Sequence, residues 1–217
     1  MKIYKIGHSC FTLKQGNTTI LTDPGQFSSD NLEREEMRKI RNVNAVLVTH
    51  VHGDHLNTDS LKAIMGNNPN VEVIGNQEVH GLLGGEGIEV HTVKDKEEFL
   101  VGDFKLQAFE TDHGFIHKTI SAVRNTGYLF NGVVYHPGDA LFAPPGEIEL
   151  LGVPFGAPWA TIGQLIDYAI EVHPRRVTPS HDGLLRELGP FQSLSTKMLG
   201  EVGIEFIPLR PGEEYEV

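Results

Sequence analysis

Residues 45–55 read AVLVTHVHGDH, an unbroken apolar run followed directly by a loop rich in histidine and aspartate. Such an apolar run suits a strand that is buried on both faces inside a layered protein. His50 and His52 lie two residues apart, so their side chains point to the same side of an extended segment. His50 and His52 can therefore bind one cation together. Asp54 and His55 follow Gly53 and can reach a second cation nearby. Because imidazoles and carboxylates are ligands for zinc or iron, the pattern predicts a metal site.

Further histidines and aspartates follow other predicted strands, in the segments Asp112-His113, Gly138-Asp139 and Ser180-His181-Asp182. In open α/β sheets, functional groups converge where strands end. The sequence therefore predicts a site for two divalent cations, which can activate water for a hydrolysis. His117, four residues after His113, is an alternative ligand, and His113 is favoured because it directly follows the strand.

The rest of the chain predicts alternating strands and helices, with a turn at Asn131-Gly132 that is typical of a hairpin. Residues 143–158 hold four prolines and predict a long loop. We expect strands at 1–6, 10–14, 18–22, 45–48, 71–74, 88–93, 128–130, 133–135 and 176–180, a hairpin over 99–110, and helices at 30–41, 58–65, 77–83, 161–172 and 191–199. The pattern favours one layered α/β domain over residues 1–217.

Composition narrows the class of protein. The chain has 217 residues with 18 basic and 29 acidic side chains, a formal net charge of −11, which argues against a nucleic-acid partner. No apolar run approaches the length of a membrane span, and no secretory signal is visible at the start. The single cysteine, Cys10, fits a reducing compartment. We expect a cytoplasmic protein that acts on a small-molecule substrate.

The segment from Thr49 to His55, together with Asp23, His113, Gly138-Asp139 and His181, resembles the metallo-β-lactamase superfamily. The resemblance implies a four-layer αββα sandwich with the metal site at one edge of its two sheets. It also implies the ligand sets: His50, His52 and His113 for the first metal, Asp54, His55 and His181 for the second, and Asp139 as the bridge.

Two other segments narrow this resemblance. Residues 7–11, GHSCF, and residues 22–25, TDPG, are similar to those of small metal-dependent hydrolases related to ascorbate-6-phosphate lactonase. In the family, the aspartate that matches Asp23 supports the metal loop, and a histidine at the position of His8 lies close to the metals. From the residues alone, Asp23 satisfies local backbone N–H groups, and His8 either binds substrate or holds a neighbouring loop.

The sequence and the resemblance together predict a hydrolase that acts on a small ester, lactone or phosphodiester with two divalent ions. Zinc is the first candidate for these ions, and manganese and iron are alternatives. Asp54 is expected to orient the nucleophile, and His8 or His136 to protonate the leaving group. Trp159 is expected to be a packing anchor or to line the substrate entrance. An iron-dependent oxidoreductase similar to a persulfide dioxygenase is the alternative, because it keeps the same motif. The third hypothesis is a metal-binding domain without catalytic activity.

Overall fold

The computed structural model describes residues 1–26 and 39–217, and in that part of the chain two seven-stranded sheets form. The predicted helix at 30–41 lies almost wholly outside these residues. The first sheet has the order β14-β1-β2-β3-β4-β5-β6 and the second β13-β12-β11-β10-β9-β8-β7. The bounds in the first sheet are β1 Lys2–Gly7, β2 Cys10–Gln15, β3 Thr18–Thr22, β4 Ala45–Leu47, β5 Glu72–Gly75, β6 His91–Thr92 and β14 Glu214–Glu216. Those in the second are β7 Glu98–Val101, β8 Phe104–Asp112, β9 Arg124–Phe130, β10 Val134–His136, β11 Leu150–Pro154, β12 Arg176–Ser180 and β13 Glu205–Phe206.

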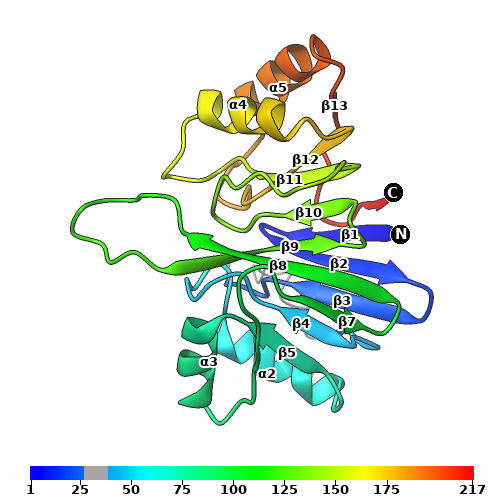
Figure 1. Ribbon diagram of the computed structural model, residues 1–217, viewed down its shortest axis with the longest axis vertical. Helices are drawn as coiled ribbons and strands as arrows, with labels where there is room; N and C mark the ends of the chain where they lie inside the picture. The colour runs from blue at the N-terminus through cyan, green and yellow to red at the C-terminus, as the bar shows by residue number, and fades with distance from the viewer. Residues whose placement is uncertain (27–38) are drawn as a thin grey trace.

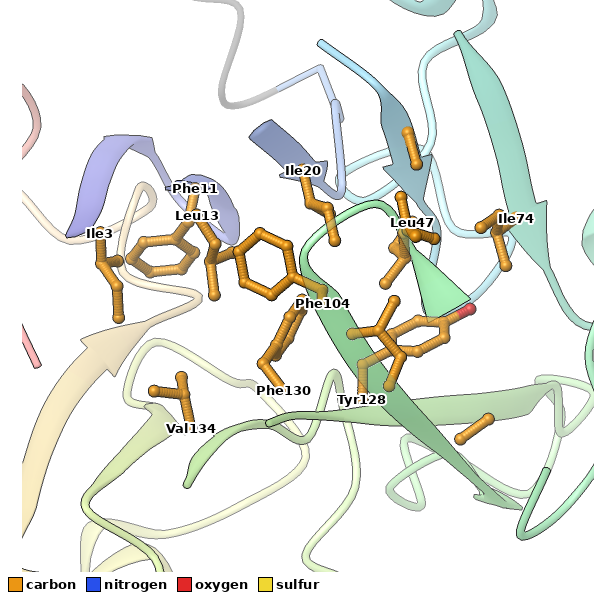
Figure 2. Packing of buried hydrophobic residues seen from close by; sticks show 14 of the residues in the cluster. Ile3, Phe11, Leu13, Ile20, Leu47, Ile74, Phe104, Tyr128, Phe130 and Val134 are labelled. Carbon is orange, nitrogen blue, oxygen red and sulfur yellow. The ribbon is translucent and has the colours of Figure 1, made fainter. Parts of the chain in front are cut away.

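The two sheets pack face to face through a core of apolar side chains (Figure 2). Ile20 and Leu47 from the first sheet meet Phe104, Tyr128 and Phe130 from the second, and each of these is fully buried. Side chains on a strand alternate between faces, so one face of each sheet supplies this layer while the other face is free for helices. Burial of this apolar surface is the main force that holds the sheets together.

Helices cover the outer face of each sheet, α2 and α3 at one end of the molecule and α4 and α5 at the other (Figure 1). Leu61 and Leu83 pack with Val46 of the first sheet, and Leu165 packs with Val153 of the second. The bounds are α2 Thr58–Asn67, α3 Gln77–Gly84, α4 Ile162–Val172 and α5 Pro190–Gly200. The order helix, sheet, sheet, helix confirms the predicted four-layer αββα sandwich.

Most expected elements are present within a few residues, including the hairpin at Asn131-Gly132, where both residues have positive φ. The long loop predicted over 143–158 is wrong, because β11 runs through it as an interior parallel strand between β10 and β12. Pro154 is the last residue of β11, where a missing N–H costs little. Within residues 1–26 and 39–217, no helix is both long enough and apolar enough to cross a bilayer.

Candidate metal centre

The histidine-rich loop follows β4, a strand in the interior of the first sheet. Its backbone is fixed by the segment after β3, since the N–H of Gln26 donates to the carbonyl of Gly53 at 2.8 Å. Gly25 allows this contact, because a Cβ there would lie 1.7 Å from the carbonyl oxygen of Asp54. The TDPG segment and the histidine loop are therefore packed as one unit.

The two sheets are hydrogen-bonded to each other at the point where β4 ends. The hydroxyl of Tyr128 donates to the carbonyl of Val48 at 3.0 Å, and the N–H of Thr126 donates to the carbonyl of Thr49 at 2.9 Å. Both donors belong to β9 of the second sheet. These contacts fix the end of β4 against the neighbouring sheet, which sets the position of the whole loop.

The second sheet brings its residues from the ends of separate strands. His113 follows β8, Asp139 follows β10 and His181 follows β12, while His8 lies in the turn after β1 of the first sheet. Gly138 has φ +62°, and the amide oxygen of Asn125 accepts the N–H of Asp139 at 2.9 Å, so the turn that presents Asp139 is held from β9. Asn125 is a site residue that the sequence analysis missed, because nothing in the pattern of β9 marks it.

All seven predicted metal ligands lie together. Their ligand atoms form three overlapping groups in which every atom is within 4.8 Å of the others. These groups are His50, His52 and His113; His8, Asp54, His55 and His181; and His50, His55 and Asp139. The first and second groups match the predicted division of ligands between two metals, and His8 is an addition to the second.

Asp139 lies between the groups and is almost fully buried. Its Oδ1 is 3.2 Å from Nε2 of His55, and its Oδ2 is 3.3 Å from Nε2 of His113 and 3.1 Å from Nε2 of His181. Asp54 lies on the more exposed side, with Oδ2 3.3 Å from Nε2 of His181. One buried carboxylate therefore touches histidines from both predicted ligand sets.

The chemistry of these atoms fits a divalent metal. Among the described residues, Nε2 of His55, Nε2 of His113 and Oδ1 of Asp139 are buried and make no hydrogen bond of good geometry. A buried polar atom without a partner costs free energy, and such atoms are rare in folded proteins unless they serve a function. Imidazole nitrogens and a carboxylate oxygen that converge in this way are a suitable set of ligands for zinc or iron.

Asp23 holds the histidine loop from behind. Its Oδ1 accepts the N–H of Thr49 at 2.8 Å, and its Oδ2 lies 2.8 Å from Nδ1 of His55 and 3.0 Å from Nε2 of His136. A proton on Nδ1 of His55, donated to this carboxylate, would leave Nε2 as the nitrogen that binds a metal once its own proton is displaced. The contact places His136 behind the loop and outside the three groups of ligand atoms, which favours His8 over His136 as the residue that contacts a leaving group.

Charge and burial set the protonation of the cluster in the absence of metal. Burial lowers the pKa of His50 well below its ordinary value, and burial also lowers the pKa of His52. Burial opposes the charged form of His181, but the Asp139 and Asp54 carboxylates outweigh it and raise its pKa to about 9. Burial would raise the pKa of Asp139, but His55 and His181 hold that pKa well below its ordinary value. His181 is therefore protonated in the absence of metal, and a divalent cation that binds it would displace this proton.

Three residues of the cluster have unusual backbone conformations. His8, Asp23 and His181 have φ of 44°, 39° and 54°, in the left-handed region that residues other than glycine rarely adopt. Each such conformation costs about 1–3 kcal/mol and persists only where the surroundings enforce it. The N–H of His181 donates to the carbonyl of His8 at 3.2 Å, so two of the three stabilise each other.

The structure separates the two histidines that the sequence left as alternatives. His113 is buried, with Nδ1 2.6 Å from the carbonyl oxygen of Gly114, so its Nε2 faces the cluster. His117 is exposed, and its Nδ1 lies 2.8 Å from Oγ1 of Thr119. Only His113 is in a position to bind a metal together with His50 and His52.

Trp159 has a closer relation to the site than the sequence predicts. Its indole Nε1 donates to Oδ2 of Asp139 at 2.9 Å, and its ring lies 5.7 Å from that of His113. Trp159 is thus a contact of the central carboxylate as well as a packing residue. The signal in the sequence is weak, because Trp159 stands in an irregular segment after β11 with no motif around it.

The comparisons with known proteins agree with this geometry. The β-lactamase superfamily domain matches residues 2–181 of the chain. Protein Rv0786c of Mycobacterium tuberculosis is 31% identical over 190 residues, which cover 85% of this chain and 85% of that protein. The UPF0173 metal-dependent hydrolase MJ1163 of Methanocaldococcus jannaschii is 28% identical over 230 residues, with 97% of this chain and 98% of that protein covered. Igni18, a metallo hydrolase from the archaeon Ignicoccus hospitalis, has the same fold, with a TM-score of 0.76, 19% identity, and coverage of 100% of this chain and 98% of that chain.

Proposed function

Because the chain belongs to the metallo-β-lactamase superfamily and is a metal-dependent hydrolase, we propose that it hydrolyses a small ester, lactone or phosphodiester at a dinuclear centre. The observation that carries this proposal is Asp139, whose two carboxylate oxygens contact histidines of both ligand groups. If both groups hold a divalent cation, Asp139 would be a ligand shared by the two ions.

In this proposal His50, His52 and His113 hold one ion, and Asp54, His55 and His181 hold the other. Zinc is the first candidate, since its usual ligands in proteins include histidine nitrogen and carboxylate oxygen. When bound, two such cations polarise the substrate's carbonyl or phosphoryl oxygen and make water a nucleophile near neutral pH.

The protein's own groups would orient the reactants and donate a hydrogen bond. Asp54 is the least buried carboxylate of the cluster, so its Oδ2 can accept a hydrogen bond from the attacking water and orient it. Nδ1 of His8 accepts the N–H of Gly183 at 3.1 Å, which places the proton of the neutral imidazole on Nε2. Nε2 of His8 is 3.5 Å from Oδ2 of Asp54, so the Nε2 proton of His8 is our candidate for a hydrogen bond to the leaving group.

The substrate class follows the resemblance to ascorbate-6-phosphate lactonase and rests on the residues around His8 and Asp23. We propose that residues 1–217 form one domain and that the enzyme works in the cytoplasm, since its single cysteine, Cys10, is buried and cannot form a disulfide within the chain.

The test is elemental analysis of protein that has been purified without added metal. About two equivalents of zinc or manganese, followed by turnover of a lactone, ester or phosphodiester, would support the proposal. One equivalent of iron with oxygen consumption on a thiol persulfide would support the oxidoreductase instead. His50→Ala should lose metal, while His80→Ala, which removes a histidine outside the three ligand groups, should keep it.

A further inference from the structure

A cavity of about 980 Å³ lies beside the candidate metal centre, between the segment after β12 and helix α5. Its volume is in the range of pockets that hold small molecules. Gln192, Ser193 and Thr196 line one wall, and their spacing of three and four residues puts them on one face of α5. This face is polar, whereas Leu199 of the same helix packs into the core.

Three basic side chains line this cavity: Arg186, Lys197 and Arg210. In residues 1–26 and 39–217, none of the three has a carboxylate oxygen within 4.0 Å, although the chain carries a formal net charge of −11. Like charges on one wall repel each other, and an acidic protein has enough carboxylates to pair them. Their arrangement therefore favours a negatively charged guest.

The acidic side chains of the wall do not cancel this charge. Asp182 lines the cavity, but its Oδ2 lies 2.7 Å from Nζ of Lys5, a lysine that is fully buried. Glu187 is the other carboxylate on the wall. The wall of the cavity thus carries three basic side chains and one carboxylate without a basic partner, so its net charge is positive.

The cavity shares a wall with the metal centre. Asp182 and Gly183 line the cavity and directly follow His181, and the N–H of Gly183 donates to Nδ1 of His8. The lining of the cavity therefore begins at the residue after His181 and includes a residue that contacts His8.

We propose that this cavity binds an oxyanion group of the substrate, a phosphate ester or a carboxylate, while the bond to be hydrolysed lies at the metal centre. The inference rests on the proposed hydrolase function and adds a substrate class to it. Arginine and lysine both recognise such groups, and arginine can do so through two parallel hydrogen bonds.

Calorimetric titration of the metal-loaded protein with inorganic phosphate and with succinate tests the binding. We expect one of them to bind, and Lys197→Gln combined with Arg210→Gln to weaken that binding by about tenfold at fixed ionic strength. Lys14→Gln, an exposed lysine on β2, is the matched control and should change nothing. Tighter binding of phosphate identifies a phosphate ester, and tighter binding of succinate a carboxylate. Absence of binding, or binding that the double variant leaves unchanged, would overturn the inference.

Kinetics separate this inference from the proposed function. With a neutral ester the double variant should keep kcat/KM, and with an ester that carries a phosphate or carboxylate its KM should rise by about tenfold. If the neutral ester is hydrolysed and the charged ester is unaffected by the substitutions, the inference fails while the hydrolase stands. If no ester, lactone or phosphodiester reacts, the proposed function fails, whatever the cavity binds.

Discussion

The two sheets contribute ligands to the candidate metal centre in different ways, one through a single short loop and the other through three separate loops. The first sheet places His50, His52, Asp54 and His55 through one loop after β4. The second sheet places His113, Asp139 and His181 through three loops after three strands. A single loop brings four ligands together along one short stretch of backbone, which the segment after β3 and strand β9 hold in place. Three loops need the register of a whole sheet, so the second half of the site depends on tertiary packing much more than the first.

The largest effect is expected where the two halves meet, at Asp139. Asp139→Ala removes the carboxylate that contacts His55, His113 and His181, so we expect metal content to fall and hydrolysis to drop to background. Elemental analysis and a hydrolysis assay measure both. Circular dichroism checks that the fold is retained. Unchanged metal content would show that the two halves do not share this ligand.

The second sheet can be tested alone with a pair of histidines. His113→Ala should abolish activity, because His113 is buried beside His50 and His52. His117→Ala should leave activity unchanged, since His117 is exposed and contacts Thr119. The comparison uses the same assay for both variants. The reverse result would transfer the ligand role to His117.

The next largest effect is expected at Asp23, which supports the histidine loop of the first sheet. Asp23→Asn keeps the size of the side chain but weakens its hold on Nδ1 of His55, so we expect metal affinity to fall by about 10–100-fold. Competition with a chelator measures this affinity. Asp103→Asn is the matched control, because Asp103 also accepts a backbone N–H, that of Asn17, but lies outside the site. Equal losses in the two variants would mean that Asp23 acts on folding and not on the metal loop.

A smaller effect is expected from the indole that reaches Asp139 from the segment after β11. Trp159→Phe removes a hydrogen bond to a charged group, and we expect activity to fall by about tenfold with most of the metal retained. Trp159 is the single tryptophan of the chain, so its fluorescence should also change when metal is added. In Asp139→Ala that change should be lost, whereas a fluorescence response that persists there would place the effect elsewhere.

The smallest effect is expected at Thr161, at the start of α4 and outside the three ligand groups. The side chain of Thr161 accepts the N–H of Gln164 in a capping box, so Thr161→Ala should cost about 1 kcal/mol of unfolding free energy. Metal content should stay the same. Denaturant unfolding measures the loss, and Thr161→Ser should restore most of the stability. A change in metal content would indicate that α4 positions the site.

Much of this arrangement follows from local pattern. The apolar run before Thr49, the Asn131-Gly132 turn and the amphipathic helix after Thr161 are confirmed because each is decided by neighbouring residues. The strand β11 was missed because the four prolines of residues 143–158 favour a loop locally, while its place between β10 and β12 is decided by distant residues. Asn125 was missed for the same reason, as was the hydrogen bond of Trp159 to Asp139, since both contacts join residues far apart along the chain.

The sequence by itself predicted a layered α/β domain with a cluster of metal ligands after a buried strand, because residue type, alternation and spacing along one strand and loop are local properties. The αββα sandwich was implied by the resemblance to the metallo-β-lactamase superfamily. The contact of Trp159 with Asp139, the contact of His136 with Asp23, and the basic cavity beside Gly183 were decided only by the tertiary structure. The physical reason is that the conformation of a strand, a helix or a turn is set largely by adjacent residues. A contact between strand ends depends instead on how two sheets pack and on which side chains that packing leaves buried.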